Sequence, residues 1–359
     1  MTGGLSLSDS GLLMIGKLPA PALVLHPIDD VRVLRRPTTF TGMEERPSGI
    51  QDFDVRDALR AWGIDPVTLE YAPVGFGDYH WTATDTRDCR WFVKVADLDH
   101  KSWYGEGTGA AFRGLRDAMD TAVALREAEP DGRLDFVVAP VRTADGESVR
   151  GLGPGHAVSV FPLMSGTAGH FGETLTPHDR ALVVDLLAGL HRTVPPASAR
   201  ALPPEFATRP QLEPALGELG NPWHGFGPYA EPARHLLADH AAALRHRLDE
   251  FDRRAGELQA ASAPLVVTHG EPRPGNLLRA GERRLLLDWD TVGLAVPERD
   301  LWLVVAGPDD LLRYEESTGR KPDPSALALY RLRRALNDIA EFLTLLRAPH
   351  GPTLDVRQS

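Results

Sequence analysis

The sequence predicts an α+β protein with two lobes, a β-rich N-terminal lobe and a mainly helical C-terminal lobe. Short strand-like runs rich in β-branched and aromatic residues lie between residues 69 and 163, whereas long amphipathic stretches dominate after residue 163. A chain of 359 residues, 42% of them hydrophobic, is long enough for two such cores. We therefore expect a poorly ordered arm or added edge element at 1–44, an N-terminal lobe at 45–163 and a C-terminal lobe at 164–359.

The N-terminal lobe is expected to begin with a helix and three strands. Val55, Leu59 and Trp62 recur at helical spacing and predict a short helix over 52–62. Short connections, one of them containing glycine, join the next three apolar runs and indicate hairpins. A helix and two more strands complete the lobe. The expected strands are 69–74, 80–84, 90–95, 136–139 and 157–163, and the expected helix is 110–129.

The C-terminal lobe is expected to be helical. Thr176 and Pro177 form a favourable N-cap and first-position pair, which predicts a helix that ends near His191. Two longer amphipathic stretches predict helices over 231–258 and 325–346.

Composition narrows the classes of partner. The formal net charge of −11 argues against non-specific nucleic-acid binding, which needs a basic surface, and weakly favours a cationic partner. No apolar run approaches the ~18–20 residues of a membrane span, so we expect no membrane partner. Cys89 is the single cysteine, which excludes an internal disulfide framework or a cysteine-rich metal site. We expect a reducing compartment and a cytoplasmic protein.

The segment from 265 to 290 carries the most chemistry. A β-branched run leads into a loop that contains Glu271, and a predicted hairpin with its turn near Glu282 follows. Asn276 and Asp288 are equidistant from that turn, so an antiparallel hairpin brings them side by side at its open end. An amide oxygen beside a carboxylate suits Mg²⁺, and Glu271 supplies a base at the same end. These parts are what phosphoryl transfer requires, although Asn276 alone is equally consistent with a turn cap.

This segment resembles a known family. The run His-Gly-Glu at 269–271, followed by Asn276 and Asp288, resembles the catalytic and metal-binding motifs of aminoglycoside phosphotransferases and choline kinases. The runs Asp-Trp-Asp at 288–290 and Pro-Glu-Arg-Asp-Leu at 297–301 are most similar to spectinomycin-type phosphotransferases. The resemblance implies a protein-kinase-like fold that uses ATP and Mg²⁺ to phosphorylate a hydroxyl of a small molecule.

The resemblance also implies roles for single residues. Glu271 matches the catalytic base, Asn276 and Asp288 match Mg²⁺ ligands, and His269 and Asp300 match positions that brace the catalytic loop. The family base is usually Asp, and the carboxylate of Glu271 lies one methylene further out. A nucleotide-binding pseudokinase therefore stays open as an alternative.

A kinase-like fold requires a lysine on the third strand, where it meets the nucleotide phosphates. Lys94 lies there among apolar residues, and a buried lysine needs an acidic partner. We expect that partner on the following helix, with Asp120 favoured and Asp117 as the alternative.

Two further segments are expected to contact the nucleotide. Gly75 and Gly77 join the first two strands, where their backbone N–H groups can approach phosphates. The run 161–166 matches the hinge between lobes, and by resemblance its backbone around Pro162 and Met164 binds adenine.

The acceptor follows from resemblance alone. An antibiotic such as spectinomycin or an aminoglycoside is favoured, with a metabolic kinase of choline, an amino alcohol or a sugar as the alternative. Asp338 and Glu341 lie beside the apolar face of the last long helix, where they either contact a cationic acceptor or form a solvated face.

Overall fold

The computed structural model describes residues 25–28, 31–34, 46–47, 49–75, 77–128, 134–170 and 172–348. The chain divides into two compact units, Met1–Arg35 and Arg36–Ser359. In the first unit, β1 (Leu25–Ile28) and β2 (Val31–Leu34) form an antiparallel pair. The rest of the expected arm at 1–44 lies outside the described residues.

A five-stranded antiparallel sheet forms the β-rich part of the second unit, in the order β3-β4-β5-β7-β6. The helix α1 (Asp52–Leu59), extended by the 3-10 turn η1 (Arg60–Trp62), precedes it. The strands are β3 (Pro66–Tyr71), β4 (Asp78–Asp85), β5 (Arg90–Asp97), β6 (Arg150–Leu152) and β7 (His156–Pro162).

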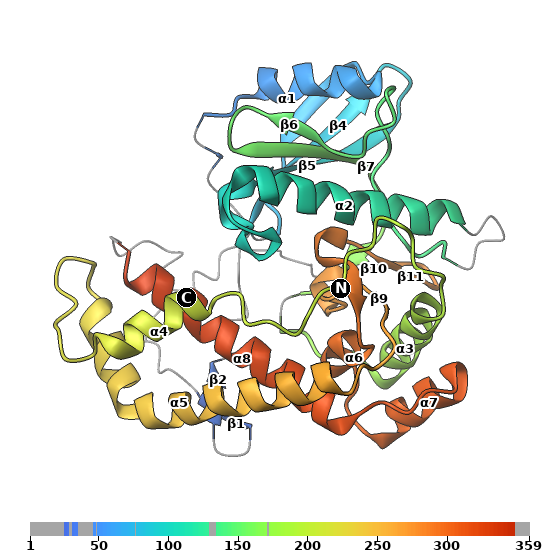
Figure 1. The fold of residues 1–359 in the computed structure, drawn as a ribbon. Helices are drawn as coiled ribbons and strands as arrows, with labels where there is room; N and C mark the ends of the chain where they lie inside the picture. Colours follow the sequence, from blue (N-terminus) through green and yellow to red (C-terminus); the bar gives the residue numbers. More distant parts are fainter. Residues whose placement is uncertain are drawn as a thin grey trace, which may run out of the picture. The chain divides into compact units, whose positions relative to one another are not determined.

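Both faces of this sheet are covered, by α1 on one side and by α2 (Gly107–Ala128) on the other (Figure 1). Because successive strand residues point to opposite faces, Val93 and Val95 of β5 pack in the core with α1. Phe92 and Ala96 pack in the other core, which α2 shares. Lys94 therefore points from the α2 face of the sheet.

Six helices make up most of the remaining chain. The side chain of Thr176 accepts a hydrogen bond from the backbone N–H of Asp179 and begins α3 as the sequence predicts. Helices α4, α5 and α8 share one hydrophobic core. None of the described helices is both long and apolar enough to cross a membrane. The six are α3 (Pro177–His191), α4 (Arg209–Gly217), α5 (Ala230–Ala260), α6 (Glu298–Val304), α7 (Pro308–Thr318) and α8 (Pro324–Leu346).

Small strand pairs carry the segment that was predicted to hold the chemistry. The predicted hairpin is confirmed, since β10 (Leu277–Ala280) pairs antiparallel with β11 (Arg283–Leu286). On its other edge β10 pairs with β8 (Thr167–Ala168). The strand β9 (Val266–Thr268) precedes the hairpin and pairs with β12 (Gly293–Ala295), which follows it. Two short 3-10 turns, η4 (Pro274–Asn276) and η5 (Trp289–Thr291), connect these strands. Two others, η2 (Leu98–His100) and η3 (Ser102–Tyr104), lie between β5 and α2.

One expected strand, 136–139, does not join the N-terminal sheet. Its Val137 forms an isolated bridge with Leu286, and the N–H of Leu286 donates to the carbonyl of Phe136 at 2.8 Å. The apolar run thus lies against the hairpin instead. The sheet position beside β7 belongs to β6, which includes Gly151.

Candidate active site

The loop between β9 and β10 contains the predicted base, and a close backbone approach fixes its shape. Gly270 has φ of +97°, a region that L side chains rarely adopt. A Cβ at this position would approach the Arg299 guanidinium to 2.4–2.7 Å. That guanidinium donates to the Thr268 hydroxyl and the Thr291 carbonyl, each at 2.7 Å. Only glycine lets the loop pass so close to Arg299.

Asp300 braces the same loop from the start of α6. Its carboxylate accepts hydrogen bonds from the backbone N–H groups of His269 at 2.8 Å and Gly270 at 2.6 Å. The third bond, at 3.1 Å, comes from Nε2 of His191, at the end of α3. Burial alone would raise the pKa of Asp300, but the bond from His191 and the charge of Arg299 outweigh it and lower the pKa.

His269 is a neutral side chain that links the loop to the hairpin. It is fully buried, and burial lowers its pKa. Its Nε2 donates to the carbonyl of Leu287 at 2.8 Å, and its Nδ1 accepts from the N–H of Glu271 at 3.2 Å. The hydroxyl of Thr291 donates to the carbonyl of His269 at 2.8 Å. The bracing role expected for His269 is therefore present.

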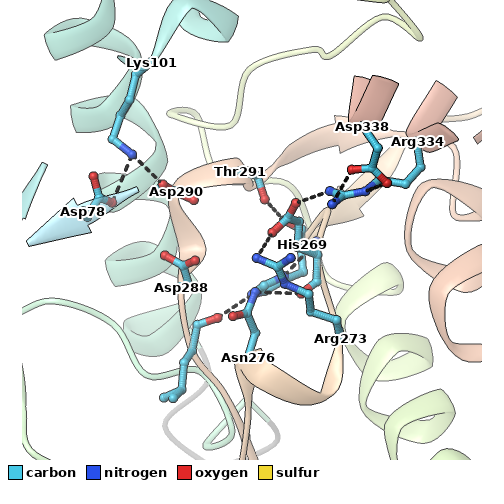
Figure 2. Close-up of polar contacts among 12 residues, drawn as sticks. Asp78, Lys101, His269, Arg273, Asn276, Asp288, Asp290, Thr291, Arg334 and Asp338 are labelled. Carbon is cyan, nitrogen blue, oxygen red and sulfur yellow. Dashed lines mark hydrogen bonds and ion pairs between the residues drawn. The ribbon is translucent and has the colours of Figure 1, made fainter. Parts of the chain in front are cut away.

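Two arginines hold the carboxylate of Glu271. One oxygen lies 2.9 Å from Arg273, and the other lies 3.5 Å from Arg334 of α8. Arg334 also pairs with Asp338, one turn further along α8, at 2.8 Å (Figure 2). The Glu271 side chain keeps 29% of its surface exposed, so a bound molecule can reach it.

Asn276 and Asp288 lie at the open end of the hairpin as predicted. The N–H of Leu287 donates to the carbonyl of Asn276 at 2.9 Å, which extends the ladder to this point. The side-chain amide of Asn276 donates to the carbonyl of Glu271 at 3.0 Å, so its oxygen remains as an acceptor. Asp288 has the left-handed backbone φ of 63° and ψ of 66°, uncommon outside glycine and typical of functional positions.

These two side chains fit a Mg²⁺ site. Both present oxygen, the ligand atom that Mg²⁺ prefers, and the Asp288 side chain is 36% exposed. Mg²⁺ in such enzymes keeps several waters and phosphate oxygens, so two protein ligands suffice. The described residues contain no cluster of three or more His, Cys, Asp or Glu side chains suited to a metal, and the assignment of Asn276 and Asp288 as Mg²⁺ ligands stays a prediction.

Lys94 reaches Asp288 from the sheet. Its Nζ lies 2.6 Å from Asp288, 2.8 Å from Asp78 and 3.4 Å from Asp290. Burial would lower the pKa of Lys94, but these carboxylates raise it well above the usual value. Burial would raise the pKa of Asp288, yet Lys94 lowers it to about 2. Both groups are therefore charged at neutral pH.

The predicted pairing of Lys94 with Asp120 is wrong. Asp120 instead accepts hydrogen bonds from Ser148 at 2.8 Å and Arg142 at 3.2 Å. The alternative, Asp117, lies 3.9 Å from Arg200. The segment just before α2 contacts Asp290, so the beginning of this helix is near the site. The first turn of α2 contains no acid, and Asp120 lies 13 residues further, about 20 Å along the axis.

Sequence reasoning missed three members of this charge cluster. Lys101 lies between Asp78 and Asp290, with its Nζ 3.0 and 2.9 Å from their carboxylates (Figure 2). Burial would lower the pKa of Lys101, but the two acids raise it. The repeated acid of the Asp-Trp-Asp run was a signal for Asp290, whereas nothing local marks Lys101 as buried.

The two segments expected at the nucleotide have the backbone for close approach. Gly75 and Gly77 have φ of +77° and +89°, and the Gly75 Cα faces the ring of His80. Pro162 ends β7, and Met164 follows with its side chain 37% exposed. These residues lie where the chain leaves β7 and leads to β8 beside the hairpin, and their adenine contact stays a prediction.

Comparison with known proteins agrees with this arrangement. Residues 72–345 match the phosphotransferase enzyme family, APH. The chain belongs to this family. It is therefore a phosphotransferase with an alcohol group as acceptor, built on the bilobal kinase-like α+β fold that the sequence predicted.

Similar proteins include "Protein StrN" of Streptomyces griseus, 30% identical over 229 residues that cover 61% of this chain and 68% of the relative. Among solved structures, spectinomycin phosphotransferase APH(9)-Ia in complex with ADP and spectinomycin has a TM-score of 0.62 at 20% identity, covering 82% of this chain and 88% of that chain. A microcompartment-associated aminopropanol kinase has a TM-score of 0.51 at 17% identity, and the match covers 83% of this chain and 94% of that chain.

Proposed function

We propose that this phosphotransferase moves the γ-phosphate of ATP to a hydroxyl of a small molecule, with Glu271 as the base. The observation that carries the proposal is the hairpin that brings Asn276 and Asp288 to one end, beside the Glu271 loop. Lys94 meets Asp288 at 2.6 Å from the opposite lobe. Base, metal ligands and phosphate-binding lysine thus converge on one region.

Each residue has a role in this proposal. Lys94 orients the nucleotide phosphates, while Gly75 and Gly77 offer backbone N–H groups to them. Asn276 and Asp288 would hold Mg²⁺, which supplies positive charge against the charge of the transferring phosphoryl group. Asp120 has no place among these contacts, because its partners are Ser148 and Arg142. The backbone of 162–164 would bind adenine, which rests on resemblance.

Glu271 takes the proton in the transfer step. The acceptor oxygen forms a bond to the γ-phosphorus as the bond to the β–γ bridging oxygen breaks, ADP leaves, and the hydroxyl proton passes to Glu271. Arg273 and Arg334 orient the longer Glu side chain. Positioning of the acceptor and the phosphates supplies most of the rate.

The acceptor class is the finer part of the proposal. An antibiotic such as spectinomycin or an aminoglycoside, expected as a cation, is suggested by the likeness to spectinomycin phosphotransferase. A metabolic small molecule such as an amino alcohol, choline or a sugar is the second candidate. The arginines around Glu271 favour an acceptor without a positive charge beside its reacting hydroxyl, such as a sugar. The use of ATP and an exposed free Cys89 suit a cytoplasmic location.

The test is ADP release from Mg·ATP against a panel of spectinomycin, aminoglycosides, macrolides, amino alcohols and sugars. We expect acceptor-dependent release, and Glu271→Gln should lower kcat by about 10²–10⁴-fold. Glu282→Gln, in the exposed turn of the hairpin, is the matched control. Near-normal turnover by Glu271→Gln would exclude it as the base, and Mg·ATP binding without release for any acceptor would favour a pseudokinase.

A further inference from the structure

A group of arginines surrounds the base of the proposed reaction. Arg334 pairs with Glu271 and Asp338, and Arg273 pairs with the other oxygen of Glu271. Arg333, the residue before Arg334 on α8, differs from both. Within the described ranges its guanidinium makes no ion pair and no hydrogen bond, and its polar neighbour is the face of the Tyr330 ring, 4.9 Å from the ring centre.

Within the described residues no carboxylate forms an ion pair with Arg333. Arg273, Arg299, Arg333 and Arg334 contribute four positive charges to this region, and Glu271, Glu298, Asp300 and Asp338 contribute four negative charges. Glu298 accepts a hydrogen bond from the backbone N–H of Asp323 at 2.7 Å.

Each of those acids already has partners. Glu271 and Asp338 pair with Arg273 and Arg334, and Asp300 accepts from His191 and two backbone N–H groups. Glu341 also acts on Arg334, but it is exposed to solvent.

The environment of Arg333 is unfavourable for its charge. Burial, and then the positive charge of Arg299, lower the pKa of Arg333 to about 10. The Arg333 side chain is only partly buried, yet a partly buried cation without an ion pair is still costly, and such groups are typical of binding sites. A guanidinium presents a planar set of donors that matches a carboxylate or a phosphate.

We propose that the acceptor carries an anionic group, a carboxylate or a phosphate, which binds Arg333 while its hydroxyl lies at Glu271. This rests on the proposed function, because it names the acceptor of the same site. Arg333 directly precedes Arg334 on α8, and Arg334 lies 3.5 Å from Glu271, so both sites are within reach of one compact molecule. The overall charge of −11 favoured a cationic acceptor, but the local charge decides what binds here.

The test compares acceptors in matched pairs that differ in one anionic group. Suitable pairs are ethanolamine and serine, 3-amino-1-propanol and homoserine, and glucosamine and glucosamine 6-phosphate. ADP release is measured with saturating Mg·ATP for the wild type, Arg333→Gln and Arg333→Lys. Arg331→Gln, on the same helix, is the control.

We expect the anionic member of a pair to have the lower KM. Arg333→Gln should raise that KM at least tenfold with little change in kcat, Arg333→Lys should recover part of the loss, and Arg331→Gln should leave both parameters unchanged. The neutral or cationic member should respond to none of these changes. As a test without variants, inorganic sulfate should compete with the anionic acceptor and not with Mg·ATP.

Two results would overturn the inference. One is turnover of the cationic members with KM values equal to or below those of their anionic partners. The other is an equal rise in KM for both members in Arg333→Gln. In either case ADP release still supports phosphotransfer, whereas a wild-type protein that does not bind Mg·ATP would defeat the proposed function itself.

Discussion

At the residue scale, two lysines share two buried acids. Asp78 and Asp290 each contact both Lys94 and Lys101, and only Lys94 reaches Asp288. Lys101 is 3% exposed and therefore contacts little solvent. By neutralising part of the charge on Asp78 and Asp290, Lys101 leaves Lys94 free to face Asp288 and, in the proposed reaction, the phosphates.

Replacing Lys101 should therefore act through Lys94. We expect Lys101→Met to raise KM for ATP several-fold and to lower the free energy of unfolding by about 3–5 kcal/mol, because it leaves buried carboxylates short of a partner. Lys101→Arg should restore part of the KM. Asp120→Asn is the matched control, since its partners lie elsewhere. Steady-state kinetics and urea unfolding check this, and an unchanged KM in Lys101→Met would contradict the positioning role.

The sequence made Glu271, Asn276 and Asp288 predictable because they belong to one short run. The register of a hairpin follows from its turn, so the placement of Asn276 and Asp288 at its open end needs only local information. The partners of Lys94 were not predictable in this way. Asp288 lies 194 residues away along the chain, and only tertiary packing decides that Lys94 meets it and not Asp120.

At the element scale, the loop between β9 and β10 depends on one glycine. Gly270→Ala places a Cβ against Arg299 at a left-handed backbone position. We expect a loss of about 1–3 kcal/mol in the free energy of unfolding from backbone strain, and a lower kcat as Glu271 shifts.

Gly275→Ala in the same loop is the matched control. A Cβ there meets nothing within 4 Å, and Gly275 does not have a positive φ. Urea unfolding and ADP release of both variants check the prediction. Equal effects of the two substitutions would show that Arg299 does not constrain the loop.

The strand β4 contains a pH-sensitive residue, His80. It pairs across the sheet with Lys94, stacks on Phe92 at 4.9 Å, and its Nδ1 bonds to the carbonyl of Val74 at 2.8 Å. Burial and then the charge of Lys94 lower the pKa of His80 from 6.5 to about 4. The ring is therefore neutral in the folded protein at neutral pH.

This depressed pKa makes stability depend on pH. Between about pH 6.5 and 4 the unfolded chain binds a proton at His80 that the folded chain does not, so stability falls as the pH falls through this window. The shift corresponds to about 3 kcal/mol. We expect His80→Gln, which keeps a donor for Val74, to lose less stability than the wild type from pH 6.5 to 4 in urea unfolding. Parallel pH profiles of the two proteins would refute this.

The types of the helices and strands could be predicted from the periodicity of the sequence. The pairing of residues 136–139 and the strand β6 could not. An apolar run such as 136–139 suits any half-buried extended segment, and the hairpin strand β11 pairs with it through Leu286. The strand β6 was not predicted because it contains Gly151, and glycine weakens the strand signal of a sequence. In the structure β6 forms because β7 supplies its hydrogen-bonding partner.

At the scale of the whole molecule, a buried charge cluster joins the sheet to the helical lobe. Lys94 and Lys101 supply two positive charges, and Asp78, Asp288 and Asp290 supply three negative charges, an excess of one negative charge. Asp288 is the most exposed of the three acids, so the excess negative charge is accessible to solvent at this residue. We therefore expect the junction of the lobes to favour a divalent cation and to repel a nucleotide that arrives without one.

Nucleotide should therefore stabilise the molecule only together with Mg²⁺. At 100 times its Kd, Mg·ADP should raise the free energy of unfolding by about 2.7 kcal/mol. EDTA should remove this gain, because ADP alone brings its phosphates to Asp288 uncompensated. Asp288→Asn should also lose the gain, whereas Glu282→Gln in the exposed hairpin turn should keep it. Thermal unfolding with ADP, with Mg·ADP and with Mg²⁺ alone distinguishes these cases. Full stabilisation of Asp288→Asn by Mg·ADP would mean that the metal binds elsewhere and that Asp288 serves only to hold Lys94 across the junction.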